Sequence, residues 1–241
     1  MSRLELSSTK VFRSQRYPSV QAIVEVDRDA NRSLADKAGD LILGKIISGE
    51  FAAGHRLKST ELSEQLGMSR TPVTKAMAKL SSEGILAQPN NLQAIVTPEA
   101  CEWLVQTHEL RQLLEPAAAE RAAGNVPDDV LDDLRTLARD AEESGGQLWE
   151  EAAKYFDFAL HLSLADYCGN VPIKVSIRRC WKFKMLSYDL SEGCRSSLLQ
   201  EYEQHLAILS AIARGHGKRA RKEMANHLQA ASVERFSERV I

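Results

Sequence analysis

Apolar residues recur at helical spacing through most of this chain, and segments with a strand-like pattern are short. The first clear stripe predicts a helix over residues 33–47, with Ser33 as its N-cap. The stripe consists of Leu34, Ala38, Leu41, Ile42 and Ile46. A second, shorter helix is predicted from Thr60 to Leu66, and Gly67 ends it. These helices lead directly into a third segment that also carries candidate chemistry.

Residues 67–80 predict a capped helix with one apolar and one basic face. Val73, Met77 and Leu80 follow each other at i, i+4 and i+7, and Ser69 is placed to accept hydrogen bonds from the first turn. A helix that is buried on one side and cationic on the other suits the major groove of DNA, which admits a helix. We expect Arg70 to read bases and the lysines to contact phosphates. The expected DNA-binding set is Arg70, Thr71, Thr74, Lys75, Lys79, Lys58 and Ser69.

Two short segments, residues 85–88 and 94–97, predict a β-hairpin after this helix. The Asn90–Asn91 pair between them suits a tight turn, because asparagine tolerates the left-handed backbone conformation. Three helices and a small hairpin form a winged helix-turn-helix, in which the second helix of the pair enters the major groove. We assign this domain to residues 31–97.

The rest of the chain is predicted to be helical. Thr97 and Pro98 begin a long helix that reaches about Ala123, and Pro127 begins another that ends near Glu143. Further helical stretches are expected at about 147–168, 171–192, 195–214 and 217–239. Since no strand pattern intrudes, residues 98–241 are predicted to form an all-helical bundle. The predicted fold class is therefore mainly α, with a winged helix-turn-helix domain followed by this bundle.

The first 30 residues carry mixed charge and no helical stripe. Residues 19–26 could pair as a strand. We instead interpret residues 1–30 as a loosely held N-terminal arm that precedes the two domains.

Composition narrows the classes of function. The net charge is only −2, so binding to nucleic acid depends on the local basic face rather than on overall charge. No run of about 18 uncharged apolar residues is present to span a membrane, and the N-terminus lacks a secretory signal pattern. The four cysteines, Cys101, Cys168, Cys180 and Cys194, are scattered without a C-x-x-C pair, which is typical of reduced thiols. We expect a cytoplasmic protein with no membrane partner.

Four side chains in the helical half have the composition of a metal site. Asp157 and His161 lie one turn apart on a helical face, and His205 and His227 lie on two later helices. Three imidazoles and a carboxylate suit zinc, nickel or a similar divalent ion and leave coordination positions for water or a ligand. The alternative is that each histidine is a hydrogen-bonded core residue, and the spacing alone leaves both interpretations open.

Arg111 also has two interpretations. With Glu115 four residues later, it can form an ordinary surface salt bridge. It can instead point inward and await a carboxylate, since a planar guanidinium binds carboxylates in a bidentate manner.

Several motifs are shared with one known family. In the first half they are Gly54-x-x-Leu57, Glu61-Leu62-Ser63-Glu64-Gln65-Leu66-Gly67, Ser69-Arg70-Thr71-Pro72-Val73, Leu80 and Glu83-Gly84-Ile85. In the second half they are Leu110-Arg111-x-x-Leu114-Glu115-Pro116, Asp157-x-x-x-His161, Gly169-Asn170, His205 and His227. Over about residues 33–235 the chain resembles a GntR-family transcriptional regulator of the subgroup with a helical FadR-type C-terminal (FCD) ligand-binding domain. Thr74 and Lys75 depart from the family, which commonly has arginine and then glutamate there.

The resemblance implies a homodimer that binds a palindromic operator and is released or retuned by a small organic acid. It implies that the set Asp157, His161, His205 and His227 holds a divalent metal ion, with zinc or nickel favoured. It also implies that Arg111 and Asn170 contact the carboxylate effector.

We therefore expect a DNA-binding transcriptional repressor whose operator affinity depends on a small organic acid bound at a metal-containing pocket. One alternative is a regulator for which the metal itself, or oxidation of the cysteines, is the signal. Another is a helical metalloenzyme, since such metal sites can activate water. The enzyme hypothesis leaves the basic helix unexplained and offers no evident general base, so we predict no enzymatic activity.

Overall fold

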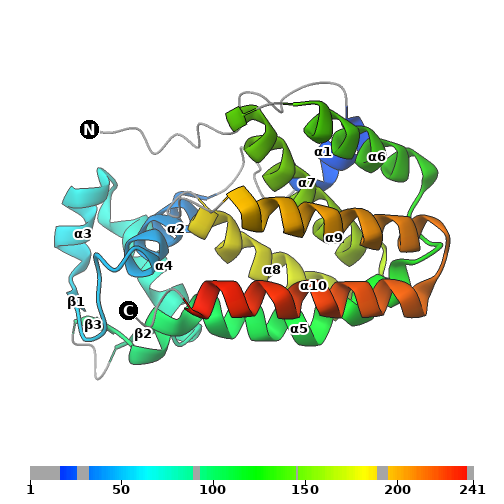
Figure 1. Cartoon of the computed structure of the whole chain (residues 1–241). Coiled ribbons are helices and arrows are strands. Elements are labelled where there is room, and N and C mark those ends of the chain that lie inside the picture. The colour runs from blue at the N-terminus through cyan, green and yellow to red at the C-terminus, as the bar shows by residue number, and fades with distance from the viewer. Residues whose placement is uncertain (1–16, 26–32, 89–92, 145, 189–194, 238–241) are drawn as a thin grey trace. The chain divides into compact units, whose positions relative to one another are not determined.

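A computed structural model describes residues 17–25, 33–88, 93–144, 146–188 and 195–237 of the chain. These residues form helices and one small antiparallel sheet (Figure 1), which confirms the predicted mainly α fold. They fall into two compact units. The first, the winged-helix unit, comprises the described residues of 28–107 and 183–190. The second, the helical unit, comprises the described residues before 28, residues 108–182, and those after 190.

The winged-helix unit contains the three predicted helices and the predicted hairpin. Its helices are α2 (Leu34–Ile47), α3 (Ser59–Leu66) and α4 (Arg70–Ser82). Its strands are β1 (Arg56–Leu57), β2 (Leu86–Ala87) and β3 (Ala94–Val96), in the order β1-β3-β2. Strand β1 was not predicted, and it pairs antiparallel with β3 through the Arg56–Ile95 register. The wing is therefore three-stranded, while its turn at residues 89–92 lies outside the described residues.

Local sequence signals define the helix boundaries in this unit. The Ser33 side chain accepts a hydrogen bond from the Asp36 N–H group and caps α2, as predicted. Gly67 ends α3 with φ 62°, a left-handed conformation that glycine adopts without steric cost. The Met68 N–H group then donates to the Ser63 carbonyl oxygen at 3.0 Å, which completes the turn into α4. This turn sets the direction of the helix that carries the basic face.

The core of the winged-helix unit follows the predicted stripes except in α2. Val73, Met77 and Leu80 of α4 are buried, as predicted. In α2, Leu34 is 58% exposed and Leu41 is only half-buried, so neither belongs to the core, whereas Leu43 is buried and was missed. The side chains of Trp103 and Leu104 also pack against this core.

The helical unit contains the predicted bundle. Its helices are α1 (Pro18–Glu25), α6 (Asp128–Glu143), α7 (Gly146–Tyr167), α9 (Arg195–Ala213) and α10 (Gly217–Ser237), together with most of α5 (Trp103–Ala122) and α8 (Val171–Tyr188). Helices α5 and α8 each begin in one unit and continue into the other without interruption. None of the described helices combines the length and apolarity that crossing a bilayer requires.

The predicted helix from Pro98 begins differently from our expectation. Residues Pro98–Glu102 form a 3₁₀ helix, η4, and the α-helical geometry starts only at Trp103. Thr97 occupies the N-cap position, but its hydroxyl donates backward to the Gly84 carbonyl oxygen at 2.9 Å instead of capping the helix. Thr97 therefore joins the helix start to the wing.

The predictions for residues 18–25 are wrong, because this segment forms α1 rather than a strand or a loosely held arm. Tyr17 and the apolar face of α1 (Val20, Ile23 and Val24) are buried, and α1 packs against α6 and α7. The carboxylate of Asp133 accepts hydrogen bonds from the N–H groups of Ser19 and Val20 at 2.8 and 3.1 Å. At the other end, Arg178 donates to the Ile23 carbonyl oxygen at 3.1 Å. The remaining residues of the predicted arm lie outside the described residues.

Candidate DNA-reading face and metal centre

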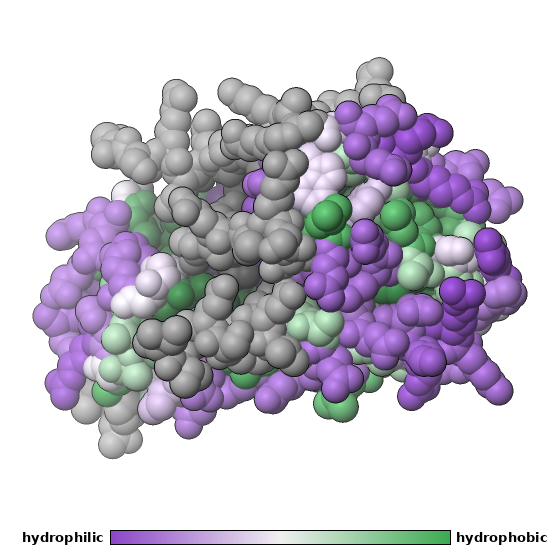
Figure 2. Space-filling model, viewed as in Figure 1, coloured by the Kyte–Doolittle hydropathy of each residue, from purple (hydrophilic) through white to green (hydrophobic). Residues whose placement is uncertain are grey.

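The predicted DNA-binding residues are all exposed. The exposed set is Lys58, Ser69, Arg70, Thr71, Thr74, Lys75 and Lys79. In the view of Figure 2, the surface over α3 is largely hydrophilic. Ser69 is the N-cap of α4 in its backbone conformation, but its side chain makes no capping hydrogen bond, so that part of the prediction is wrong. The amphipathic design of α4 is as predicted.

The basic residues of this set are not equivalent. Lys79 Nζ lies 2.8 Å from Asp36 Oδ1, and Lys58 Nζ lies 2.6 Å from Glu61 Oε1. Within the described part of the chain, Arg70 and Lys75 form no such ion pair. Exposed pairs contribute only about 0–1 kcal/mol, so a DNA phosphate competes for both lysines at little cost.

The four predicted metal ligands converge, although they come from three helices. Asp157 and His161 lie on α7, His205 on α9 and His227 on α10. All four side chains are buried, and each offers one ligand atom within 4.8 Å of the others. His205 Nε2 lies 3.2 Å from His161 Nε2 and 3.1 Å from His227 Nε2. Asp157 Oδ1 lies 3.1 Å from His205 Nε2 and 3.3 Å from His161 Nε2.

The hydrogen bonds on the far side of two rings fix which nitrogen faces the centre. His161 Nδ1 lies 2.5 Å from Glu115 Oε2, and His227 Nδ1 lies 2.9 Å from Gln204 Oε1. Both oxygens are acceptors, so each Nδ1 donates its proton, and in the neutral ring Nε2 keeps its lone pair. The lone pairs of His161 and His227 therefore point into the same small space as the Asp157 carboxylate.

This arrangement fits a divalent cation. Ligand atoms about 2.0–2.1 Å from a zinc ion and arranged tetrahedrally lie roughly 3.3 Å apart. Four of the six separations between the ligand atoms are 3.1–3.3 Å, close to that value, and all six are within 4.8 Å. Burial lowers the pKa of His161, which favours the neutral ring that metal coordination needs. The donor set suits zinc, nickel and similar ions without selecting one.

Arg111 is buried, so the interpretation as a surface salt bridge is wrong, although its partner is the expected one. Its Nε atom lies 2.6 Å from Glu115 Oε1, and both side chains are only 3% exposed. Glu115 also accepts a hydrogen bond from Trp181 Nε1 at 2.8 Å. Burial alone would raise the pKa of Glu115, but Arg111 and His161 outweigh it and hold that pKa well below its usual range. Sequence reasoning gave the i, i+4 spacing of Arg111 and Glu115 and missed the role of Glu115 beside His161.

Asn170 has a local partner. Its side-chain oxygen accepts a hydrogen bond from the Ile173 N–H group at 3.0 Å, at the start of α8. An asparagine in this position is a helix N-cap. This local hydrogen bond does not test the predicted contact of Asn170 with an effector, which stays a prediction.

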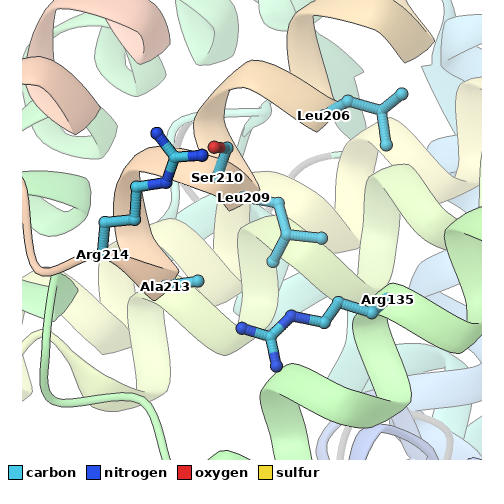
Figure 3. Close-up of a pocket in the computed structure, with 6 residues that line it drawn as sticks. All are labelled: Arg135, Leu206, Leu209, Ser210, Ala213 and Arg214. Atoms are coloured by element: carbon cyan, nitrogen blue, oxygen red, sulfur yellow. The ribbon is translucent and has the colours of Figure 1, made fainter.

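A surface pocket of about 320 Å³ lies between α6 and α9. Figure 3 shows Arg135 and Arg214 on either side of Leu209. The other lining residues are Leu206, Ser210 and Ala213, and no candidate metal ligand lines this pocket. It is therefore distinct from the metal centre.

Comparison with protein families agrees with this division into a winged-helix unit and a helical unit. Residues 34–89 match the model described as bacterial regulatory proteins, gntR family, and residues 106–230 match the model of the FCD domain. The chain belongs to the GntR family of transcriptional regulators, in the group with an FCD domain. It is a DNA-binding transcriptional regulator and not an enzyme.

Individual relatives support this assignment. The chain is 29% identical over 217 residues to the Uxu operon regulator of Haemophilus influenzae, covering 83% of this chain and 81% of that protein. It is 27% identical to the HTH-type transcriptional regulator LutR of Bacillus subtilis, covering 76% of this chain and 92% of LutR. Among solved structures, E. coli McbR/YncC has the same fold, with a TM-score of 0.63 at 22% identity and coverage of 86% of this chain and 99% of that one.

Proposed function

We propose that this regulator is a homodimeric repressor whose affinity for a palindromic operator is set by a small carboxylate. The carboxylate binds at a divalent metal ion held by Asp157, His161, His205 and His227. The observation that carries the proposal is the convergence of these four buried ligand atoms within 4.8 Å of one another. Histidines that only form ordinary hydrogen bonds in a core have no reason to place three Nε2 atoms and a carboxylate around one point.

A bound divalent ion supplies Lewis acidity and coordination positions that carboxylate oxygens can fill. The four side chains supply one ligand atom each, which leaves a position open when the ion takes five or six ligands. The guanidinium of Arg111 stands nearby, because its partner Glu115 is hydrogen-bonded to His161. A carboxylate effector in this region gains a charge-assisted hydrogen bond from Arg111, which it shares with Glu115.

On the DNA side, α4 is the reading helix. Arg70 is placed to contact base edges, and Lys75 and Lys79 to contact phosphates. A dimer presents two copies of α4 to successive major-groove faces about 34 Å apart, or a multiple of that distance. Ligand binding in the helical unit would favour one placement of the two reading helices over another. DNA in the cytoplasm is the expected target.

The test is metal analysis of the purified protein, followed by thermal-shift screening of small carboxylates with and without a chelator. We expect about one divalent ion per chain and a carboxylate whose stabilising effect disappears when the chelator is present. The His161→Ala variant lacks one predicted metal ligand. It should therefore lose both the bound ion and the stabilisation by the carboxylate. A His161→Ala protein that binds metal and carboxylate like the wild type would show that the site is misassigned.

The same experiment separates the alternatives. Operator release by metal alone, with no carboxylate required, would replace the acid sensor by a metal sensor. Turnover of the bound acid by metal-loaded protein would point to chemistry that the family assignment does not include. Carboxylate binding that persists unchanged in chelator would place the effector away from the four ligands.

A further inference from the structure

The carboxylate of Glu115 lies at the meeting point of three helices. It is carried by α5 and is 2% exposed as a residue. His161 of α7 and Trp181 of α8 donate to it at 2.5 and 2.8 Å, and Arg111 of its own helix donates at 2.6 Å. Burying a carboxylate is costly unless it is paired and hydrogen-bonded. The number of donors shows that this site is built around the charged form of Glu115.

Arg111 donates to both oxygens of Glu115, from Nε to Oε1 at 2.6 Å and from Nη2 to Oε2 at 3.4 Å. Trp181 Nε1 also donates to Oε1, while His161 Nδ1 donates to Oε2. The Arg111 guanidinium also lies 4.2 Å from the centre of the Trp181 ring, a cation–π distance. Arg111 and Trp181 therefore fix the orientation of the carboxylate, and the carboxylate in turn faces the imidazole.

The geometry excludes Glu115 as a ligand in the converging group. It contacts the Nδ1 side of His161, whereas the other ligand atoms gather on the Nε2 side. A carboxylate that accepts the Nδ1 proton of a metal-bound histidine selects the tautomer, orients the ring and raises its basicity as a ligand. The His161 ring is further confined by Trp181, with ring centroids 4.7 Å apart.

We infer that Glu115 is the positioning residue of the metal centre, which acts through His161 and is itself held by Arg111 and Trp181. This inference rests on the proposed metal site. It gives Arg111 a second role, because the guanidinium that is predicted to meet an effector carboxylate also anchors Glu115. A ligand that draws Arg111 toward itself thereby changes the support of His161.

The first measurement needs no metal. Long-range ¹H–¹⁵N correlation spectra of metal-free protein report the tautomer of each histidine, and the His161→Gln variant assigns the His161 signals. We expect the Nδ1–H tautomer for His161 in the wild type and a mixture of tautomers in Glu115→Gln, whose amide can donate as well as accept. An unchanged tautomer in Glu115→Gln would overturn the inference whether or not the protein binds metal.

The second measurement is metal affinity, with Zn²⁺ competed against a chromophoric chelator and Co²⁺ absorption used to report ligand geometry. Glu115→Gln should weaken Zn²⁺ binding about 10- to 100-fold and alter the Co²⁺ spectrum. The matched control is Glu120→Gln on the same helix, since Glu120 pairs at the surface with Arg221 at 2.8 Å. This control should match the wild type in affinity and spectrum.

A third variant separates positioning from a merely structural ion pair. Glu115→Asp keeps the negative charge for Arg111 but shortens the reach toward His161, so it should weaken Zn²⁺ binding to a similar extent. Wild-type affinity in Glu115→Asp and Glu115→Gln would overturn the positioning role. Failure of the wild-type protein to bind Zn²⁺ would instead refute the proposed metal site, and the tautomer measurement would still decide the role of Glu115.

Discussion

The ring of His108 is hydrogen-bonded to the backbone carbonyl oxygen of Leu228, the residue that follows the predicted ligand His227. The distance from His108 Nε2 to this oxygen is 2.8 Å, and Nε2 donates because a carbonyl oxygen only accepts. Gln112, one turn further along α5, donates to the same oxygen at 3.3 Å. Helix α5 is therefore fastened to α10 beside the candidate metal centre.

The first residues of α5 belong to the winged-helix unit. Trp103 and Leu104 pack against the core of that unit. Further along, His108, Arg111, Gln112 and Glu115 follow at i, i+3, i+4 and i+7, which places them on one face of α5. One continuous helix thus carries residues that contact two ligand-bearing helices and residues that pack against the core of the winged-helix unit. We propose that α5 couples binding at the candidate metal centre to α4.

The first prediction concerns this connection. Gln112→Leu removes one donor to Leu228 with little change in volume, so metal and effector should still bind. The change in operator affinity that the effector causes should shrink by about 0.5–2 kcal/mol, since the coupling between the sites passes through this contact. Fluorescence anisotropy with a duplex selected by the wild-type protein measures it. Gln106→Leu, at an exposed position of α5, is the control, and equal coupling in both variants would refute the prediction.

The sequence alone was enough to predict features that depend on residue spacing within one helix. The stripe of α4 and the ligand spacing of α7 are of this kind, because both depend on periodicity within one segment. Strand β1 is only two residues long and has no local signature, since its pairing with β3 creates it. Asn170 before Val171 and Pro172 carries an N-cap signal that places the start of α8.

The helical structure of α1 could not be predicted from its local sequence, because it depends on tertiary contacts. Its β-branched residues favour a strand on local propensity, and eight residues are too few for a stable isolated helix. Asp133 of α6 caps its first turn and Arg178 of α8 caps its last, so distant residues decide its structure. Burial of Glu115 was hidden in the same way, since the i, i+4 spacing with Arg111 is identical for a surface pair and a buried one.

The second prediction concerns removal of the metal. A ligand present at about 100–1,000 times its Kd adds about 2.7–4.1 kcal/mol to the free energy of unfolding. Chelation should therefore lower the thermal midpoint of the wild-type protein by several degrees, and excess Zn²⁺ should restore it. Differential scanning calorimetry measures both changes. The thermal midpoint of His205→Ala should change neither with chelator nor with Zn²⁺. A wild-type midpoint that is the same with and without chelator would argue against the metal site.

The third prediction concerns the reading face. Lys75→Ala should reduce the slope of log affinity against log salt by about 1, because one phosphate contact is lost. Arg70→Ala should cost about 1–3 kcal/mol and relax the preference at one base pair. Lys37→Ala, an exposed lysine on α2, controls for the loss of one positive charge. An Arg70→Ala protein with unchanged affinity and sequence preference would refute the assignment of Arg70 as a base reader.

The fourth prediction uses the thiol of Cys180. Burial, reinforced by the negative charge of Glu115, raises the pKa of Cys180 to about 11. A raised pKa favours the protonated thiol, so at pH 8 roughly one Cys180 in a thousand is the reactive thiolate. Alkylation at pH 8 followed by mass spectrometry should modify the exposed Cys101 first and Cys180 only after unfolding. Rapid modification of Cys180 in the native protein would contradict this and would revive oxidation of the cysteines as a signal.

The fifth prediction concerns the docking of α1. The Asp133 carboxylate accepts two N–H groups at the start of this helix, where the positive end of the helix dipole adds to the attraction. Asp133→Asn keeps the shape but removes the charge, and it should lower the free energy of unfolding by about 1–3 kcal/mol. Urea unfolding followed by circular dichroism measures the loss. Asp132→Asn is the matched control, because the exposed Asp132 pairs only with Arg135 at 2.7 Å among the described ion pairs. Equal stability of the two variants would mean that the Asp133 carboxylate contributes nothing to the docking of α1.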